Sequence, residues 1–180
     1  MLVEKKIKTV NGHELMLRNA TEADAQMMID YLRRVCGETK FLLKEPDEIT
    51  MTLEQEYAFI KRYNEAENNL LLLGFVDGQY AGNCSFAAFG PKRNRHRVNL
   101  GIALVQEFTG MGLGRFMMEQ MIEAAKNKGI EQIELEVVAN NERAIALYKA
   151  MGFEIYGTLP DNMKYSDGTY ADCHWMMRKL

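Results

Sequence analysis

Three glycines at alternate positions, Gly110, Gly112 and Gly114, separate an apolar, strand-like run from a strongly helical one. Residues 99–105 are typical of a strand, and apolar residues recur at helical spacing from Leu113 onward. The glycines therefore open a helix, whose first N–H groups have no partner within the helix. These donors, with the positive end of the helix dipole behind them, favour a bound phosphate or diphosphate. A glycine-rich turn without a ligand is the alternative interpretation.

Two well-known nucleotide motifs do not fit this turn. The dinucleotide fingerprint G-x-G-x-x-G, begun at Gly110, needs a glycine at position 115, where the chain has Arg115. A Walker loop needs its second glycine at the same position, followed by Lys and Ser or Thr. The turn is therefore neither a Rossmann fingerprint nor a P-loop.

A second strand-to-helix unit follows, with I-E-L-E-V-V at residues 133–138, A-N-N-E-R-A-I-A-L-Y at 139–148 and M-G-F at 151–153. Together with the T-G-M-G-L-G turn, this order resembles the GNAT superfamily of acyl-CoA-dependent N-acetyltransferases. The usual signature of that family, Arg/Gln-x-x-Gly-x-Gly/Ala, keeps its glycines here as Gly112 and Gly114, but Thr109 stands where Arg or Gln is common. The resemblance is close from about residue 70 to residue 180 and loose before it.

Alternating strand and helix patterns predict a three-layer α/β fold. The resemblance implies a GNAT-like α/β/α arrangement, with a mixed, mostly antiparallel sheet of six or seven strands whose fourth and fifth strands splay apart. The 180 residues contain no linker, repeat or low-complexity run, so we expect a single domain over residues 1–180. We expect strands up to about residue 18 and near 70–76, 80–89, 97–105, 132–138, 153–158 and 169–179, and helices near 22–36, 52–66, 112–128 and 141–151.

The resemblance implies acetyl-CoA as cosubstrate, with its pantetheine arm in the gap between the splayed strands and its diphosphate on the amides of the glycine turn. The residues assigned to this molecule are Ala103, Leu104, Val105, Gly110, Met111, Gly112, Leu113, Gly114, Arg115, Asn141 and Tyr148. Asn141 can either cap the following helix or hydrogen-bond the pantetheine. No metal site is expected, since the His and Cys residues lack ligand spacing.

Attack of an amine on a thioester requires two proton transfers. An alkyl ammonium with a pKa of roughly 10 must lose a proton, and the leaving thiolate benefits from gaining one. Tyr148 matches the tyrosine that commonly points at the thioester sulfur in the family, so it is the candidate acid; a core aromatic is the alternative. Glu136 occupies the place of the proposed base in the branch that acetylates protein N-termini. The alternative places Glu134 and Glu136 on the solvated face of a strand.

The predicted function is direct transfer of an acetyl group from acetyl-CoA to a primary amine in a ternary complex. The acceptor is a small molecule or a protein amino group. The resemblance implies that the first two helices, their loop at residues 37–43 and the last hairpin bind it, with the tail at residues 167–172 and the following His174, Trp175, Met176 and Met177 as candidate walls. A non-catalytic acyl-CoA-binding or sensing module on the same fold is the alternative, and a structural subunit is a third possibility. Homodimers are common in the superfamily, so a homodimer is also considered.

Charge and hydropathy limit the remaining partners. The net charge of −3 argues against a nucleic-acid partner, although residues 92–97 form a local basic cluster. That cluster is a solvated hairpin tip or a contact for an acidic substrate or a CoA phosphate. No apolar run approaches the ~20 residues that cross a bilayer, so we expect no membrane partner and a cytoplasmic location. The three cysteines are expected to be reduced.

Overall fold

The computed structural model describes residues 3–180 and contains, in this range, one sheet of eight strands in the order β1-β2-β3-β4-β5-β6-β8-β7. Neighbouring strands are antiparallel except for the parallel pair β5 and β6. The strands are β1 (Lys6–Val10), β2 (His13–Asn19), β3 (Leu70–Val76), β4 (Gln79–Ala88), β5 (Arg97–Leu104), β6 (Gln132–Val138), β7 (Glu154–Lys164) and β8 (Tyr170–Lys179).

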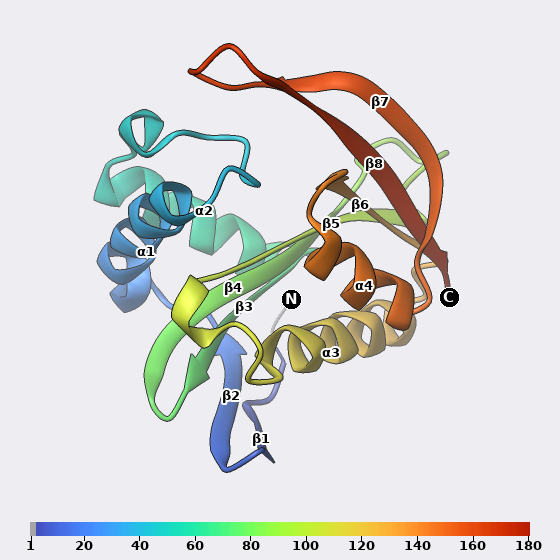
Figure 1. Cartoon of the computed structure of the whole chain (residues 1–180). Helices are drawn as coiled ribbons and strands as arrows, with labels where there is room; N and C mark the ends of the chain where they lie inside the picture. Colours follow the sequence, from blue (N-terminus) through green and yellow to red (C-terminus); the bar gives the residue numbers. More distant parts are fainter. Residues whose placement is uncertain (1–2) are drawn as a thin grey trace.

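Four α-helices cover the two faces of this sheet. Helices α1 (Ala25–Glu38) and α2 (Leu53–Glu65) lie on one side, and α3 (Leu113–Asn127) and α4 (Glu142–Ala150) lie on the other (Figure 1). The predicted three-layer α/β arrangement is therefore confirmed. The sheet has eight strands rather than six or seven because the N-terminal segment forms a complete hairpin. Asn11 and Gly12 both have positive φ angles, 50° and 85°, which allow a reversal in two residues.

Strand β3 is buried along its whole length because it separates two hydrophobic cores. Leu70 and Leu72 face the main core, which contains Met117 and Met121 of α3. The alternate residues of β3, Leu71 and Leu73, face a smaller core under α1 and α2. Met117, Met118, Met121 and Met176 are fully buried in the main core, where their flexible side chains fill irregular space.

The capping signals in the sequence correspond to real helix starts. Thr52 accepts a hydrogen bond of 3.3 Å from the amide of Gln55, whose side chain accepts one of 2.9 Å from the amide of Thr52, and α2 begins at the next residue. A similar box joins Thr21 and Asp24, but there it opens a single 3-10 turn before α1. The helix predicted from residue 22 therefore starts as a tighter turn.

Strands β5 and β6 pair over only three positions, from Arg97 opposite Gln132 to Asn99 opposite Glu134. Beyond these pairs β5 continues beside β4, and β6 continues beside β8. The strands predicted to be fourth and fifth therefore diverge as expected. We call this divergence the splay.

The hairpin of β7 and β8 curves across the upper part of the molecule toward the segment that follows α1 (Figure 1). At its tip Asp167 forms a 2.8 Å ion pair with Lys40, and the hydroxyl of Tyr165 donates a 3.1 Å hydrogen bond to the Lys40 carbonyl. Strand β7 extends past the predicted end near residue 158 and includes Pro160. Because β7 is an edge strand, it tolerates a proline that has no N–H group.

Two further observations concern the expected location and redox state. None of the helices within residues 3–180 is both long enough and apolar enough to cross a membrane. Cys36, Cys84 and Cys173 are buried free thiols.

Candidate active site

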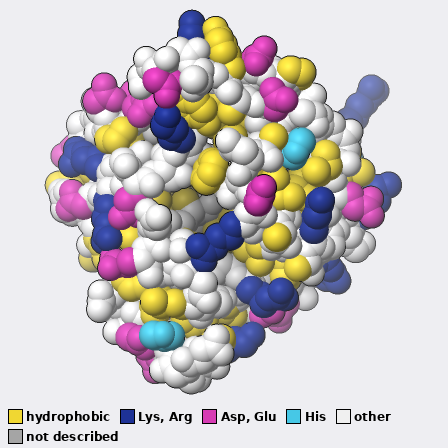
Figure 2. Space-filling view, in the orientation of Figure 1, with side chains coloured by type: hydrophobic (Ala, Val, Ile, Leu, Met, Phe, Trp, Pro, Cys, Tyr) yellow, Lys and Arg dark blue, Asp and Glu magenta, His cyan; other side chains and the backbone are white. Residues whose placement is uncertain are grey.

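A cleft of about 780 Å³ opens at the splay. Its walls come from β4, β5 and β6, from the glycine turn before α3, from one side of α4, and from the end of α1 with the segment after it. The space-filling view shows the molecule hollowed near the middle of the face seen in Figure 1, with positively charged side chains beside the hollow (Figure 2). The cleft is therefore a channel between two halves of one sheet.

The glycine turn presents free backbone donors to one end of this cleft. Gly110 and Gly112 have φ angles of 88° and 91°, in the left-handed region that favours glycine. The first bond of the α3 ladder runs from the amide of Phe116 to the carbonyl of Gly112, at 3.1 Å. The amides of Leu113, Gly114 and Arg115 precede it and have no place in the ladder. This end of the cleft thus suits an anion.

Positive side chains surround the same end. Arg115 and Arg143 both line the cleft, and the first turn of α3 contains no acidic residue. A guanidinium nitrogen of Arg143 lies 3.2 Å from the point where a Cβ on Gly110 would stand. Two guanidinium groups and a helix N-terminus together favour a phosphate or diphosphate.

The three positions assigned to pantetheine, at the end of β5 and just after it, are placed differently. Ala103 and Leu104 line the cleft. The carbonyl of Ala103 accepts a 2.8 Å hydrogen bond from the hydroxyl of Tyr31 on α1. Val105 is only 2% exposed, and its amide donates to the carbonyl of Ala81 at 2.9 Å. The cleft lining also omits Met111, which packs against the core, and Leu113, which is fully buried in it.

Both residues assigned on α4 line the cleft. The side-chain oxygen of Asn141 accepts a 3.2 Å hydrogen bond from the amide of Ala144, so Asn141 caps the helix. Tyr148 is 7% exposed, and its ring lies 6.1 Å from that of Phe153. Burial raises the pKa of Tyr148 to about 12. Its hydroxyl therefore keeps its proton at neutral pH and can donate it to a leaving group.

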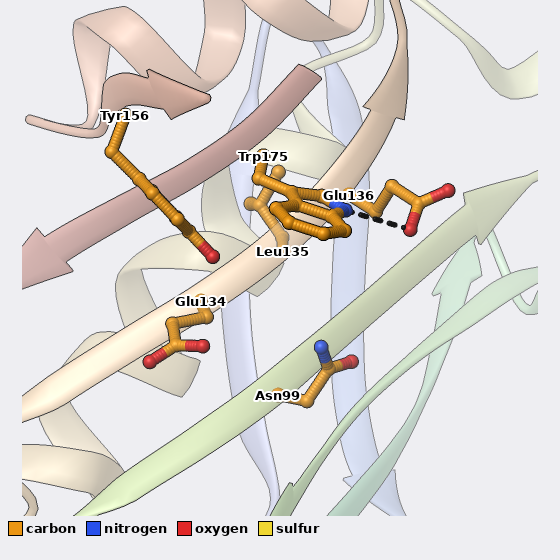
Figure 3. Close-up of a pocket in the computed structure, with 6 residues that line it drawn as sticks. All are labelled: Asn99, Glu134, Leu135, Glu136, Tyr156 and Trp175. Atoms are coloured by element: carbon orange, nitrogen blue, oxygen red, sulfur yellow. Dashed lines mark hydrogen bonds between the residues drawn. The ribbon is translucent and has the colours of Figure 1, made fainter. Parts of the chain in front are cut away.

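Glu136 lies on β6 where the cleft meets a second, smaller pocket. Its carboxylate accepts hydrogen bonds from the Asn162 side chain at 2.7 Å and from the indole N–H of Trp175 at 3.0 Å. Figure 3 shows the bond from Trp175. The side chain is exposed, as the solvated-face interpretation predicts. For Glu134 that interpretation is wrong, because Glu134 is 8% exposed and forms a 2.7 Å ion pair with Arg97.

The second pocket has a volume of about 260 Å³. It is lined by Asn99 of β5, by Glu134, Leu135 and Glu136 of β6, by Tyr156 of β7 and by Trp175 of β8 (Figure 3). We call it the carboxylate pocket.

Comparison with known proteins identifies the fold and the family. The sequence profile described as "Acetyltransferase (GNAT) family" matches residues 25–153. The chain belongs to this family. A GNAT-family acetyltransferase of Streptococcus pneumoniae is 31% identical, with a TM-score of 0.88 over 92% of this chain and 99% of that one. A ribosomal-protein-alanine N-acetyltransferase of Brucella melitensis is 26% identical, with a TM-score of 0.80 over 91% and 99%.

A curated relative is similar over a shorter span. An L-amino acid N-acetyltransferase of Escherichia coli is 33% identical over 110 residues, which are 59% of this chain and 66% of that enzyme. The chain thus matches slightly less than two thirds of the length of that relative.

Sequence reasoning missed several cleft residues of this GNAT protein. Arg143 stands in the first turn of α4, where a cation opposes the helix dipole, and that mismatch was an available signal for a ligand contact. Thr39, Phe41 and Leu42 line the cleft from the loop expected to bound the acceptor. The cleft lining includes no residue of the expected tail at 167–177, but Trp175 of that tail lines the carboxylate pocket. Among residues 3–180, no three His, Cys, Asp or Glu side chains are grouped to hold a metal.

Proposed function

We propose that the protein transfers an acetyl group from acetyl-CoA to a primary amine by direct attack in a ternary complex. The observation that carries this proposal is the composition of one cleft. Free amides and two arginines lie at one end of it, the exposed edge of β5 forms one wall, and the protonated hydroxyl of Tyr148 belongs to the same lining.

The residues present fit the cosubstrate. The amides of the glycine turn, with Arg115 and Arg143, would hold its diphosphate, since they supply donors and positive charge without an opposing carboxylate in the helix's first turn. The backbone of Ala103 and Leu104 would accompany the pantetheine, because β5 has no strand partner on its β6 side past Asn99. An elongated thioester would therefore be bound at its diphosphate end by the glycine turn and contacted along its length by the edge of β5.

The chemistry requires two positioned proton carriers. The amine nitrogen forms a bond to the thioester carbonyl carbon, and the carbon–sulfur bond breaks. Tyr148 donates its proton to the leaving sulfur, and Glu136 accepts the proton that the amine loses, directly or through water. Both residues line the same cleft, so one bound molecule can approach both.

The relatives support an amine acceptor without fixing its identity. The E. coli relative is named for free L-amino acids, and the Brucella structure is named for the alanine of a ribosomal protein. The acceptor proposed for this chain is accordingly a small amine or a protein amino group.

Two measurements on purified protein test the assignment. Calorimetry should show saturable binding of acetyl-CoA, and thiol release should rise above the hydrolytic background when a primary amine is added. If acetyl-CoA does not bind, the assignment is wrong. Binding without turnover on any amine or amino-terminal peptide would replace it with an acyl-CoA-sensing module.

A further inference from the structure

The carboxylate pocket lies on the sheet face that points away from the α3 core. Along β5, Val98 and Leu100 are buried in that core, so the side chain of Asn99 between them points to the opposite face. Ile133 and Leu135 of β6 are likewise core residues, which places Glu134 and Glu136 beside Asn99. A molecule in this pocket would therefore reach the splay from the side opposite the glycine turn.

Three polar groups around the pocket lack partners in the described part of the chain. One oxygen of Glu134 accepts hydrogen bonds from Arg97 and Gln132, both at 2.7 Å, whereas its other oxygen has none. The Asn99 amide and the Tyr156 hydroxyl also have no hydrogen-bond partner among residues 3–180. All three line the carboxylate pocket, and Figure 3 shows the Tyr156 hydroxyl pointing toward Glu134 and the Asn99 amide pointing toward Trp175. Such convergence is typical of a binding site.

The charges and rings of the pocket select a cation. Glu134 and Glu136 contribute two carboxylates, and Arg97 contributes one guanidinium, which is paired to Glu134. The rings of Tyr156 and Trp175, 6.3 Å apart, add faces that attract an ammonium group. A carboxylate placed here would meet Glu136, whose charge no ion pair offsets, and would find no unpaired cation among the lining residues.

The spacing of the two carboxylates relates the pocket to the reaction. Glu134 and Glu136 are two residues apart on one strand, so their backbones lie about 7 Å apart. Glu136 also lines the cleft that contains Tyr148. A primary amine beside Glu136 would place a group four or five carbons away next to Glu134.

We propose that the acceptor is a small aliphatic diamine: its reacting nitrogen lies beside Glu136, and its second ammonium group lies in the carboxylate pocket against Glu134, Asn99 and Tyr156. This inference rests on the proposed acetyl transfer and names its substrate class. A diamine acceptor differs from a free amino acid, because the carboxylate of an amino acid would enter a negatively charged pocket.

Trp175 provides a direct readout because it is the only tryptophan in the chain. Its fluorescence is recorded while 1,4-diaminobutane, butylamine or 4-aminobutanoate is titrated into the protein saturated with CoA. The three probes share a four-carbon chain and differ only in the group opposite the amine. We expect a saturable change with the diamine, at a Kd at least tenfold lower than with butylamine, and no saturation with 4-aminobutanoate. Equal responses to the three probes, or no response, would overturn the proposal.

Two variants locate the diamine site. Glu134→Gln keeps the shape of the side chain but removes its charge, and Asn99→Ala truncates an exposed side chain that the core does not need. Both should lower kcat/KM for the diamine at least tenfold more than for butylamine, whereas Glu131→Gln, an exposed carboxylate outside the pocket, should not. An equal loss on both amines would refute the diamine site even if Glu134→Gln proved poorly folded, because Asn99→Ala gives the same comparison.

The outcomes separate this inference from the proposed function. If butylamine is turned over as efficiently as the diamine, the acetyltransferase assignment stands and the diamine pocket is refuted. If the diamine changes the Trp175 fluorescence but is not acetylated, the binding pocket is supported and the enzymatic role is refuted.

Discussion

The hydroxyl of Tyr31 on α1 donates a 2.8 Å hydrogen bond to the carbonyl oxygen of Ala103 on β5. Burial, and then the proximity of Tyr80, raise the pKa of Tyr31 well above its ordinary value, so the hydroxyl remains a donor at any physiological pH. Because Ala103 lines the cleft at the splay, this bond ties the β5 wall of the cleft to α1.

Tyr31→Phe should therefore affect stability and cosubstrate binding together. We expect the free energy of unfolding to fall by about 1 kcal/mol, the usual net value of a hydrogen bond, and the Kd for acetyl-CoA to rise severalfold. Urea denaturation and calorimetry measure the two effects. The control is Tyr57→Phe, which removes a hydroxyl from an exposed ring on α2. An unchanged Kd in Tyr31→Phe would show that the position of β5 does not depend on this bond.

Tyr148→Phe should reduce kcat while leaving acetyl-CoA binding intact. We expect a loss of about 100-fold, within the usual range for general acid catalysis, because the leaving sulfur loses its proton donor. Since burial raises the Tyr148 pKa to about 12, the wild-type kcat should show no decline from ionisation of this group below about pH 11. Thiol release across pH 6 to 11 measures both. If Tyr148→Phe retains full turnover, water rather than Tyr148 donates the proton to the leaving sulfur.

Glu136→Gln removes a negative charge but keeps a side chain of the same size beside Trp175 and Asn162. If Glu136 accepts the proton of the amine, kcat/KM should fall by about 100-fold at neutral pH and recover partly at high pH, where more of the amine is already unprotonated. The matched control is Glu123→Gln, an exposed carboxylate on α3. A Glu136→Gln enzyme with the wild-type pH profile would exclude this residue as the base.

Gly112→Ala should weaken the diphosphate site at its centre. The left-handed backbone of Gly112 costs an L-residue about 1–2 kcal/mol, and the new Cβ would lie 2.9 Å from a methyl group of Val10. We expect a loss of stability of that size and an acetyl-CoA Kd raised about tenfold, equivalent to about 1.4 kcal/mol. Gly90→Ala serves as the control, since no heavy atom lies within 4 Å of its added Cβ. Tight binding by Gly112→Ala would contradict the assigned role of the turn.

Asp24 contributes stability that depends on pH. Burial alone would raise the pKa of Asp24, but hydrogen bonds from Arg18 and Thr21 outweigh it and lower that pKa to about 2. A carboxyl group whose pKa is lowered by folding stabilises the protein above its unfolded pKa of about 4 and loses that effect as pH falls through 2. Asp24→Asn should therefore cost about 2 kcal/mol at pH 7 and progressively less from pH 4 downward.

Urea denaturation of Asp24→Asn at pH 7 and at pH 3 measures this dependence. Asp30→Asn is the matched control, because its 3.6 Å ion pair with Arg33 is exposed and contributes little. A destabilisation of Asp24→Asn that is equal at both pH values would show that packing, rather than charge, is what the substitution removes.

Local chemistry made much of the fold predictable. The Thr52 capping box defines the start of α2, and the glycine turn defines the start of α3 at Leu113. Asp77 and Gly78, between the apolar β3 and the following β4, specify a hairpin because both residues adopt positive φ angles. These signals lie within a few residues of the feature that they determine.

Features that depend on distant partners were not predictable from the sequence. Glu134 has the pattern of a solvated strand residue, yet it is buried because Arg97, from the end of a basic loop, pairs with it across β5 and β6. The strand expected near residues 153–158 continues through Pro160 as β7, because the outer edge of β7 has no neighbouring strand that needs an N–H group. The carboxylate pocket joins residues of four strands, so no spacing in the sequence brings Asn99 and Trp175 together.

The three residue pairs that join β5 to β6 have a consequence for the durability of the molecule. The cleft proposed to hold the thioester lies where neighbouring strands share the fewest residue pairs. A molecule bound there would therefore connect the two halves of the sheet. Saturation at 100 times the Kd would add about 2.7 kcal/mol to the stability of the folded state. In a cell short of acetyl-CoA, the protein would then unfold at a lower temperature. The abundance of the protein would accordingly follow the supply of acetyl-CoA.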